Sequence, residues 1–371
     1  MTWRTTLWNG PAPSVPDDLL PLLETLTSIG APTGAEGRRA DFIQQWLAES
    51  VGLIAERDTL HNLVYDLSGG RSELTLLDAH TDTVFPDQAL TVTKDGNRWS
   101  APGIYDNTLC CVQLMMWLRA VARWQGTLPF LVSFTVGEEG TGDLRGIRAV
   151  VEHYGERLTE ACIFDLGLDK ITMQAVGSVR WVIRFQAAGG HSWGAFGQPS
   201  AVHAAAKWVA GLADRFAWRR NENSYNAGII RGGTGVNAIA EQAEVVLDLR
   251  SIDPEELERR ARALEADWVD FAKQEDVAVT AEQIGFRPAG HVPPDARVVR
   301  SVRTAIEQLG RTYRAAAGSN NANAVLAAAI PATCTGLGDG GGVHTREEYL
   351  DITSVEPGWH KLCLVTAACL D

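Results

Sequence analysis

The pattern of hydrophobic and polar positions changes twice along this chain. In the first 174 residues, segments with the apolar spacing of a helix alternate with short, almost wholly apolar stretches. The helical segments are 17–30, 35–50 and 107–124, and the apolar stretches, which predict buried strands, are 73–79, 129–136 and 161–166. This alternation predicts an α/β domain with a mostly parallel sheet that is covered by helices.

Between residues 175 and 287 the pattern is different. Strand-like segments here alternate between apolar and polar residues, which indicates strands with one face in water. The expected strands are 180–188, 243–251 and 277–285, and the expected helices are 200–216 and 254–274. Residues 288–371 return to the first pattern. We therefore expect a smaller α+β domain, 175–287, inserted into a discontinuous domain made of 1–174 and 288–371.

Composition and charge narrow the classes of partner. The 33 Lys and Arg residues against 46 Asp and Glu residues give a net charge of −13, which disfavours nucleic acid and anionic membranes as partners. The first 20 residues lack a basic segment followed by an apolar core, and no long apolar run occurs. The six cysteines show no CxxC spacing, so buried free thiols are expected. These features favour a cytoplasmic protein.

Acidic residues and histidines follow the predicted strands of the first pattern. His80 and Asp82 follow the strand 73–79, and Glu138 and Glu139 follow 129–136. Three further candidates lie at comparable places: Asp106 before the helix 107–124, Asp165 in the strand 161–166, and His344 after 331–336. Because ligand sites of parallel sheets lie at the carboxyl ends of the strands, we expect these side chains to converge at one edge.

Such a group of carboxylates would repel one another without a cation. Histidine nitrogen and carboxylate oxygen suit zinc, and Asp106, Glu139 and Asp165 with one hydroxide would balance two divalent ions. His80 and Asp82 point to the same side of an extended chain, so Asp82 could orient a metal-binding His80. Taken alone, however, a His-x-Asp pair is usually a satisfied polar pair, and two adjacent glutamates usually face solvent.

With these residues assembled, the chain resembles the dinuclear-zinc exopeptidase and deacylase family of carboxypeptidase G, peptidase T, aminoacylase and succinyl-diaminopimelate desuccinylase. The segments that carry the resemblance are PTGAEGRRADF, DAHTDTV, GIYDN, TVGEEGTG, GGHSWG, GGTGVNAIAEQAEVVLDLR and GVHTREEY. It implies a three-layer catalytic domain with an inserted lid and dimerisation domain.

The resemblance also implies roles for individual residues. One zinc would be bound by His80 and Asp165 and the other by Glu139 and His344, with Asp106 bridging them and Glu138 as the general base. The peptide bond after Asp106 would be cis. Three residues of the inserted domain match family positions: His191, which would stabilise the oxyanion in the partner subunit's active site of a homodimer, and Asn237 and Arg250, which would contact substrate.

Two departures bear on the substrate. Asn320 and Asn321 stand where relatives often have Thr and Asp, which puts any substrate contact there in doubt. Asp165 is Glu in many deacylases and carboxypeptidases of the family and Asp in several aminopeptidases and dipeptidases, which favours an exopeptidase acting on short peptides. An N-acyl amino acid deacylase remains the alternative, and a catalytically inactive metal-binding relative is a remote one. Cobalt or manganese could replace zinc.

Overall fold

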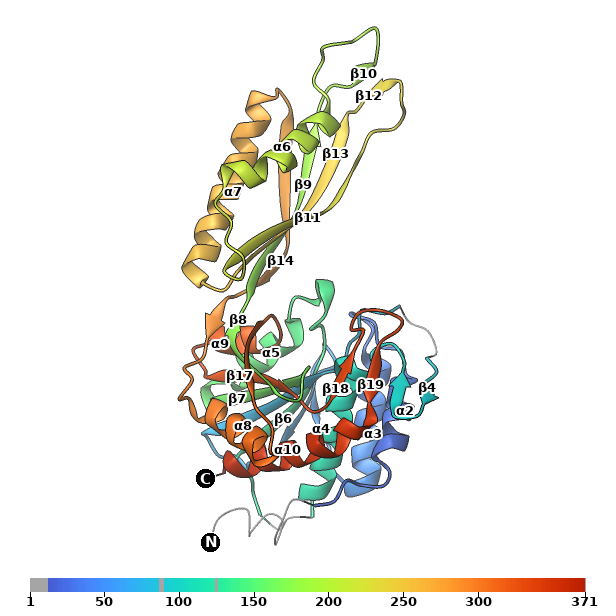
Figure 1. The fold of residues 1–371 in the computed structure, drawn as a ribbon, viewed down its shortest axis with the longest axis vertical. Coiled ribbons are helices and arrows are strands. Elements are labelled where there is room, and N and C mark those ends of the chain that lie inside the picture. Colours follow the sequence, from blue (N-terminus) through green and yellow to red (C-terminus); the bar gives the residue numbers. More distant parts are fainter. Residues whose placement is uncertain (1–12, 87–89, 124–125, 371) are drawn as a thin grey trace. The chain divides into compact units, whose positions relative to one another are not determined.

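The structure is a computed structural model that describes residues 13–86, 90–123 and 126–370. The chain divides into two compact units: Met1–Ala175 together with His291–Asp371, and Val176–Gly290 (Figure 1). The second unit is thus an insertion in the first. In the sequence, the two changes of hydrophobic pattern fall after residues 174 and 287. The first twelve residues, where the sequence predicts no targeting segment, lie outside the described residues.

A nine-stranded sheet lies in the middle of the larger unit, in the order β1-β2-β6-β3-β7-β17-β8-β15 with β16 beside β8. The neighbours β6, β3, β7 and β17 run parallel, as predicted, and β1 and β2 form an antiparallel edge. The strands are β1 (Glu56–Arg57), β2 (Leu63–Asp66), β3 (Leu74–His80), β6 (Phe130–Thr135), β7 (Leu158–Asp165), β8 (Lys170–Ala175), β15 (Gly290–His291), β16 (Arg314–Gly318) and β17 (Ala332–Gly336).

Helices cover both faces of this sheet, which gives the three layers expected of the larger unit (Figure 1). Successive residues of β3 point to opposite faces: Leu77 joins one core cluster and Leu76 the other. The first cluster includes α2 (Leu19–Thr27), α3 (Gly37–Val51), α4 (Leu109–Val121), α8 (Arg297–Gln308) and α10 (Val355–Ala368), and the second includes α5 (Arg145–Tyr154) and α9 (Ala322–Ala327).

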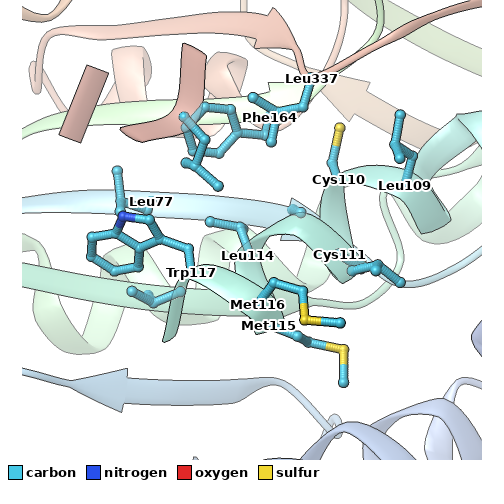
Figure 2. Close-up of a cluster of buried hydrophobic side chains, with 14 of the residues drawn as sticks. Leu77, Leu109, Cys110, Cys111, Leu114, Met115, Met116, Trp117, Phe164 and Leu337 are labelled. Atoms are coloured by element: carbon cyan, nitrogen blue, oxygen red, sulfur yellow. The ribbon is translucent and has the colours of Figure 1, made fainter. Parts of the chain in front are cut away.

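Helix α4 is the crossover helix predicted for 107–124, although Trp124 lies outside the described residues. Its side chains are apolar nearly all round because it is buried between the sheet and other helices. Figure 2 shows Trp117 beside Leu77 of β3, and Leu337 beside Phe164 of β7. All six cysteines, two of them on this helix, are buried and free, as expected.

A second, four-stranded sheet of the larger unit was not predicted. Its strands are β4 (Thr93–Asp95), β5 (Arg98–Ser100), β18 (Asp339–Gly341) and β19 (Tyr349–Asp351), in the order β18-β19-β5-β4. The hairpin of β18 and β19 holds the loop that contains His344. These strands are only three residues long, which is too short for an alternating pattern to be recognised in the sequence.

The inserted unit is an antiparallel sheet with two helices on one face, as predicted (Figure 1). The sheet order is β11-β13-β9-β14, where β11 was not predicted. Its elements are β9 (Gly177–Gln186), β10 (Gly190–His191), α6 (Ala201–Arg215), β11 (Asn223–Gly232), β12 (Ala238–Ile239), β13 (Gln242–Ser251), α7 (Pro254–Gln274) and β14 (Ala278–Arg287). Within the described residues, no helix of either unit is long and apolar enough to cross a membrane.

Candidate active site

The strand ends of the larger unit bring four of the predicted side chains together. His80 is the last residue of β3, Asp165 is the last residue of β7, and Glu138 and Glu139 follow β6, which lies directly beside β3. The register pairs His80 with Thr135, so the chain after Thr135 enters the same edge of the sheet. All four side chains are buried.

Asp106 lies between two histidines from distant parts of the sequence. Its Oδ1 is 3.2 Å from Nε2 of His80, and its Oδ2 is 3.2 Å from Nε2 of His344. On the first side, Oδ1 of Asp165 is 4.0 Å from Nε2 of His80. On the second side, Oε1 of Glu139 is 3.0 Å from Nε2 of His344. The five residues therefore form two pairs, one on each side of Asp106, and the peptide bond after Asp106 is cis, as expected.

Asp82 fixes the backbone of the glutamate pair. Its Oδ1 accepts a hydrogen bond from the N–H of Glu138, and its Oδ2 accepts one from the N–H of Glu139, both at 2.9 Å. Thr33 donates a further hydrogen bond to Oδ2 at 2.8 Å. Nδ1 of His80 lies 3.4 Å from Oδ1 of Asp82, and 3.2 Å from the backbone oxygen of the same residue. Asp82 thus holds both the histidine and the glutamates.

The protonation equilibria of the site show how strongly its charges interact. Burial and the nearby Asp106 raise the pKa of Asp165 to about 7. Hydrogen bonds with Asp106 and Glu139 raise the pKa of His344 to about 10. Burial opposes the charged form of His80, but the nearby carboxylates of Asp106 and Asp82 outweigh it and raise its pKa well above the ordinary value. In the absence of a cation, the site therefore attracts protons.

Two buried polar atoms of the site are available to bind a cation. Nε2 of His80 and Oδ1 of Asp165 have no hydrogen-bond partner among the described residues, although a buried polar atom rarely lacks one. Within the described residues, His80, Asp106 and Glu139 also have ligand atoms close enough together to hold one metal ion. Nitrogen and carboxylate oxygen form a donor set typical of zinc, manganese or cobalt. The residues present therefore fit a metal centre.

The inserted unit holds the other three candidates at two separate places. His191 and Asn237 are neighbours, since β10 pairs with β12 and the N–H of Ser192 donates to the backbone oxygen of Asn237 at 2.9 Å. Arg250 lies at the other end of β13, where it pairs with Ser178 in the β-ladder. Its Nε already donates to Oδ2 of Asp248 at 2.8 Å. The structure does not bring Arg250 together with His191 and Asn237.

Asn320 and Asn321, the departures noted in the sequence, are buried parts of the larger unit. The side-chain amide of Asn321 donates to Oδ2 of Asp78 at 2.7 Å and to Oγ1 of Thr135 at 2.8 Å. Asn320 accepts a hydrogen bond from the N–H of Ala322 at the start of α9. Asn321 is uncharged, and its amide supplies a hydrogen bond to the buried carboxylate of Asp78, two residues before His80.

Sequence reasoning missed one side chain that contacts the site. Glu348 is fully buried and accepts hydrogen bonds from the backbone N–H groups of Gly103, Tyr105 and Asp106. Glu347 beside it is exposed. The signal available in GVHTREEY was a glutamate pair directly before an apolar strand residue, which is compatible with one buried and one exposed member.

Comparison with known proteins identifies the class. Residues 76–366 match peptidase family M20/M25/M40, so the chain belongs to this family, whose members are metallopeptidases. It is a hydrolase that acts on amide bonds. A search of curated proteins finds no matching relative.

Solved structures with the same fold include three peptidases. A tripeptidase from Staphylococcus aureus subsp. aureus Mu50 is 19% identical with a TM-score of 0.82, over 96% of this chain and 99% of that one. Aminopeptidase PepT from Bacillus cereus ATCC 10987 is 17% identical with a TM-score of 0.79, over 96% and 100%. An M20 family metallo-carboxypeptidase from Sulfolobus solfataricus is 12% identical with a TM-score of 0.77, over 96% and 100%.

Proposed function

We propose that this protein is an exopeptidase that uses two divalent metal ions, most suitably zinc. His80 and Asp165 would hold one ion and Glu139 and His344 the other, with Asp106 between them. The observation that carries this proposal is the position of Asp106, whose two oxygens face the two histidines at the same distance. A carboxylate with one oxygen directed to each of two ligand pairs is suited to bridge two cations.

When bound, two such ions polarise the scissile carbonyl and lower the pKa of the attacking water. The chain itself supplies the proton transfer. Glu138 would take a proton from the water as the water oxygen forms a bond to the carbonyl carbon. It would then give that proton to the leaving amine nitrogen as the C–N bond breaks. Burial and the hydrogen bond of its backbone N–H to Asp82 support this role, because they fix the glutamate next to Glu139.

His191 is suited to donate a hydrogen bond to the developing oxyanion. The backbone N–H groups of Trp193 and Gly194 point at its Nδ1, at 3.2 and 3.3 Å. Nδ1 therefore acts as an acceptor, and the proton of the neutral ring is on Nε2. The imidazole of His191 is exposed, so its Nε2–H is available to donate a hydrogen bond to a substrate.

We infer that the lid residues of two copies complete each active site. The stretch from Gln242 to Arg250 spans about 27 Å at about 3.4 Å per residue. Gln242 pairs with Gln186, the last residue of β9, and the chain continues from Gln186 to His191 at that end of the sheet. A tripeptide extends over only about 10 Å. One inserted unit therefore cannot place both Arg250 and His191 on the same short substrate.

The sheet of the inserted unit offers an edge for such a homodimer. Strand β11 is an outer strand, and Ile229 and Ile230 on it are about half exposed, at 49% and 50%. An outer strand with exposed apolar side chains is suited to pair with another copy. We propose that Arg250 binds the substrate carboxylate in one subunit, while His191 and Asn237 of the other subunit contact the scissile group.

The choice of short peptides rests on Asp165, which matches the aminopeptidases and dipeptidases of the family, and it agrees with the tripeptidase and aminopeptidase among the similar structures. The test is hydrolysis by metal-loaded protein of unblocked di- and tripeptides against N-acetyl and N-succinyl amino acids, with a chelator as control. We expect chelator-sensitive cleavage of the free peptides. Cleavage of the acylated set alone would make the protein a deacylase, and no cleavage of either would indicate an inactive relative.

A further inference from the structure

Glu348 joins the two chain segments that carry Asp106 and His344. It is the last residue of the loop between β18 and β19, four positions after His344, and it is 0% exposed. Its Oε1 accepts hydrogen bonds from the N–H groups of Tyr105 and Asp106, both at 2.9 Å. Its Oε2 accepts one from the N–H of Gly103 at 3.1 Å. Both oxygens of this carboxylate are thus engaged with one loop.

The loop that Glu348 binds cannot satisfy these N–H groups itself. Gly103 has φ +73°, and Asp106 and Asn107 have non-helical backbone angles within the turn Ile104–Thr108. These angles interrupt the helical hydrogen-bond pattern, and the N–H groups of this loop donate to the buried carboxylate of Glu348 instead. Position 103 must be glycine in this loop, because the Cβ of any other residue would lie 2.6 Å from Cγ2 of Thr83 and clash with it.

The choice of a carboxylate is informative because the place is electrostatically unfavourable. Glu348 is buried next to Asp106, so its negative charge adds to that of the acidic group. A glutamine would avoid this charge, but it offers one oxygen where Gly103, Tyr105 and Asp106 direct N–H groups at two. Its NH₂ group would then face an N–H donor. Only a carboxylate accepts from all three.

We propose that Glu348 is a positioning residue for the metal centre: it holds the backbone at Asp106 so that the two oxygens of that side chain face both histidines. This rests on the two-metal function proposed above. Because Glu348 and His344 share one loop, release of the 103–106 segment would separate Asp106 from His344 and Glu139. Loss of Glu348 should therefore weaken binding of the second ion more than that of the first, which keeps His80 and Asp165.

The test is a calorimetric titration of metal-free, full-length protein with Co²⁺, together with the visible absorption spectrum of the bound Co²⁺. We expect the unchanged protein to bind two ions, and Glu348→Gln to bind the first normally and the second at least tenfold more weakly. The turnover number of Glu348→Gln should fall with little change in KM, and excess Co²⁺ should restore part of it. Glu347→Gln, the same substitution at the adjacent exposed residue, is the matched control and should change none of these.

The possible outcomes separate the two proposals. If the unchanged protein binds fewer than two ions, the two-metal function itself is wrong. If it binds two and Glu348→Gln also binds two with unchanged affinity and spectrum, the positioning role is wrong. Circular dichroism shows whether Glu348→Gln is folded. If it is not, Glu348→Asp serves instead, because it keeps the charge but shortens the side chain by one methylene. If Glu348→Asp binds both ions with the same affinities as the unchanged protein, the proposal is wrong.

Discussion

The candidate residues of the two units differ in how complete their contacts are. In the larger unit, His80 and Asp165 are buried and each has a polar atom with no hydrogen-bond partner among the described residues. In the inserted unit, His191 is exposed, and Arg250 is already paired with Asp248. Burial makes an unpaired polar atom costly, so such an atom indicates a ligand-binding position, whereas an exposed polar residue is satisfied by water. The structure alone thus indicates a possible metal site in the larger unit, and it indicates no comparable substrate contact among the described residues of the inserted unit.

We expect the largest effect from a substitution that removes proton transfer in the buried site and leaves the proposed metal ligands unchanged. Glu138→Gln removes the proposed general base, and a group in that role typically contributes about 10²–10⁴-fold to a rate. We expect the turnover number on a cleaved dipeptide to fall by at least about 100-fold. Metal content, measured by elemental analysis after dialysis, should stay the same because Glu138 is not one of the five proposed ligands.

Glu139→Gln serves as the comparison for Glu138→Gln. The two residues are adjacent, equally buried and held by the same carboxylate of Asp82. Glu139 lies 3.0 Å from Nε2 of His344, so its replacement should reduce metal content as well as turnover. Retained turnover in Glu138→Gln, or equal loss of metal in both variants, would contradict the separation of roles.

The next effect tests the exposed group of the inserted unit. His191→Ala removes the proposed hydrogen-bond donor to the oxyanion, and we expect turnover to fall by about 10²–10³-fold with unchanged metal content. Thermal stability should hardly change, because the side chain is exposed and is not part of the hydrophobic core cluster of the inserted unit.

Mixing variants asks whether the two units of one chain serve different sites. His191→Ala lacks the donor and Asp106→Ala lacks the proposed bridging ligand, so a heterodimer of the two would contain one site with every residue. We expect activity to rise well above that of either variant after subunit exchange. In the control, His203→Ala replaces His191→Ala. His203 is also exposed on the inserted unit, and we expect this variant to be active before it is mixed. No recovery after demonstrated exchange would place His191 in its own chain's site or in none.

Much of the catalytic fold follows from the sequence because its strands are buried and continuous. The stretches 73–79 and 129–136 coincide closely with β3 and β6, and the polar residues after them reach one sheet edge because parallel strands share their carboxyl ends. The proximity of His80, Asp106 and Glu139 was predictable in this way. The roles of these residues came from the resemblance, since carboxylates in proximity have no single function.

Features that depend on long-range contacts were not predictable. Glu348 is indistinguishable from Glu347 in sequence, and its partners lie more than two hundred residues earlier. Asn321 resembles a surface residue of a polar segment, yet it is buried against Asp78 of another element. Strand β11 was missed because its outward residues are largely exposed and include Ile229 and Ile230, which removes the alternation that marks a half-buried strand.

The smallest expected effect concerns a buried charged group whose hydrogen bonds are complete, in contrast to the buried atoms of His80 and Asp165. Lys361 of α10 is 0% exposed, and its Nζ donates to the backbone oxygens of Leu168 and Gly336, at 2.6 and 2.8 Å, and to Oγ1 of Thr335. Burial lowers the pKa of this amine to about 8 from its ordinary value of 10.5. The satisfied Nζ predicts no missing ligand, and its effect should appear in stability alone.

The sign of that effect follows from where the proton is lost. Between pH 8 and 10.5 the native state has released the proton of Lys361 while the unfolded state still holds it, so the free energy of unfolding contributed by this group rises with pH. Relative to Lys361→Met, which cannot titrate, the unchanged protein should gain up to about 3 kcal/mol across this window. Urea denaturation of both metal-free proteins at pH 7.5, 9 and 10.5 measures the difference, in which all shared titrations cancel. A difference that stays constant would mean that the buried amine remains protonated, and that its three acceptors stabilise the charge more than burial opposes it.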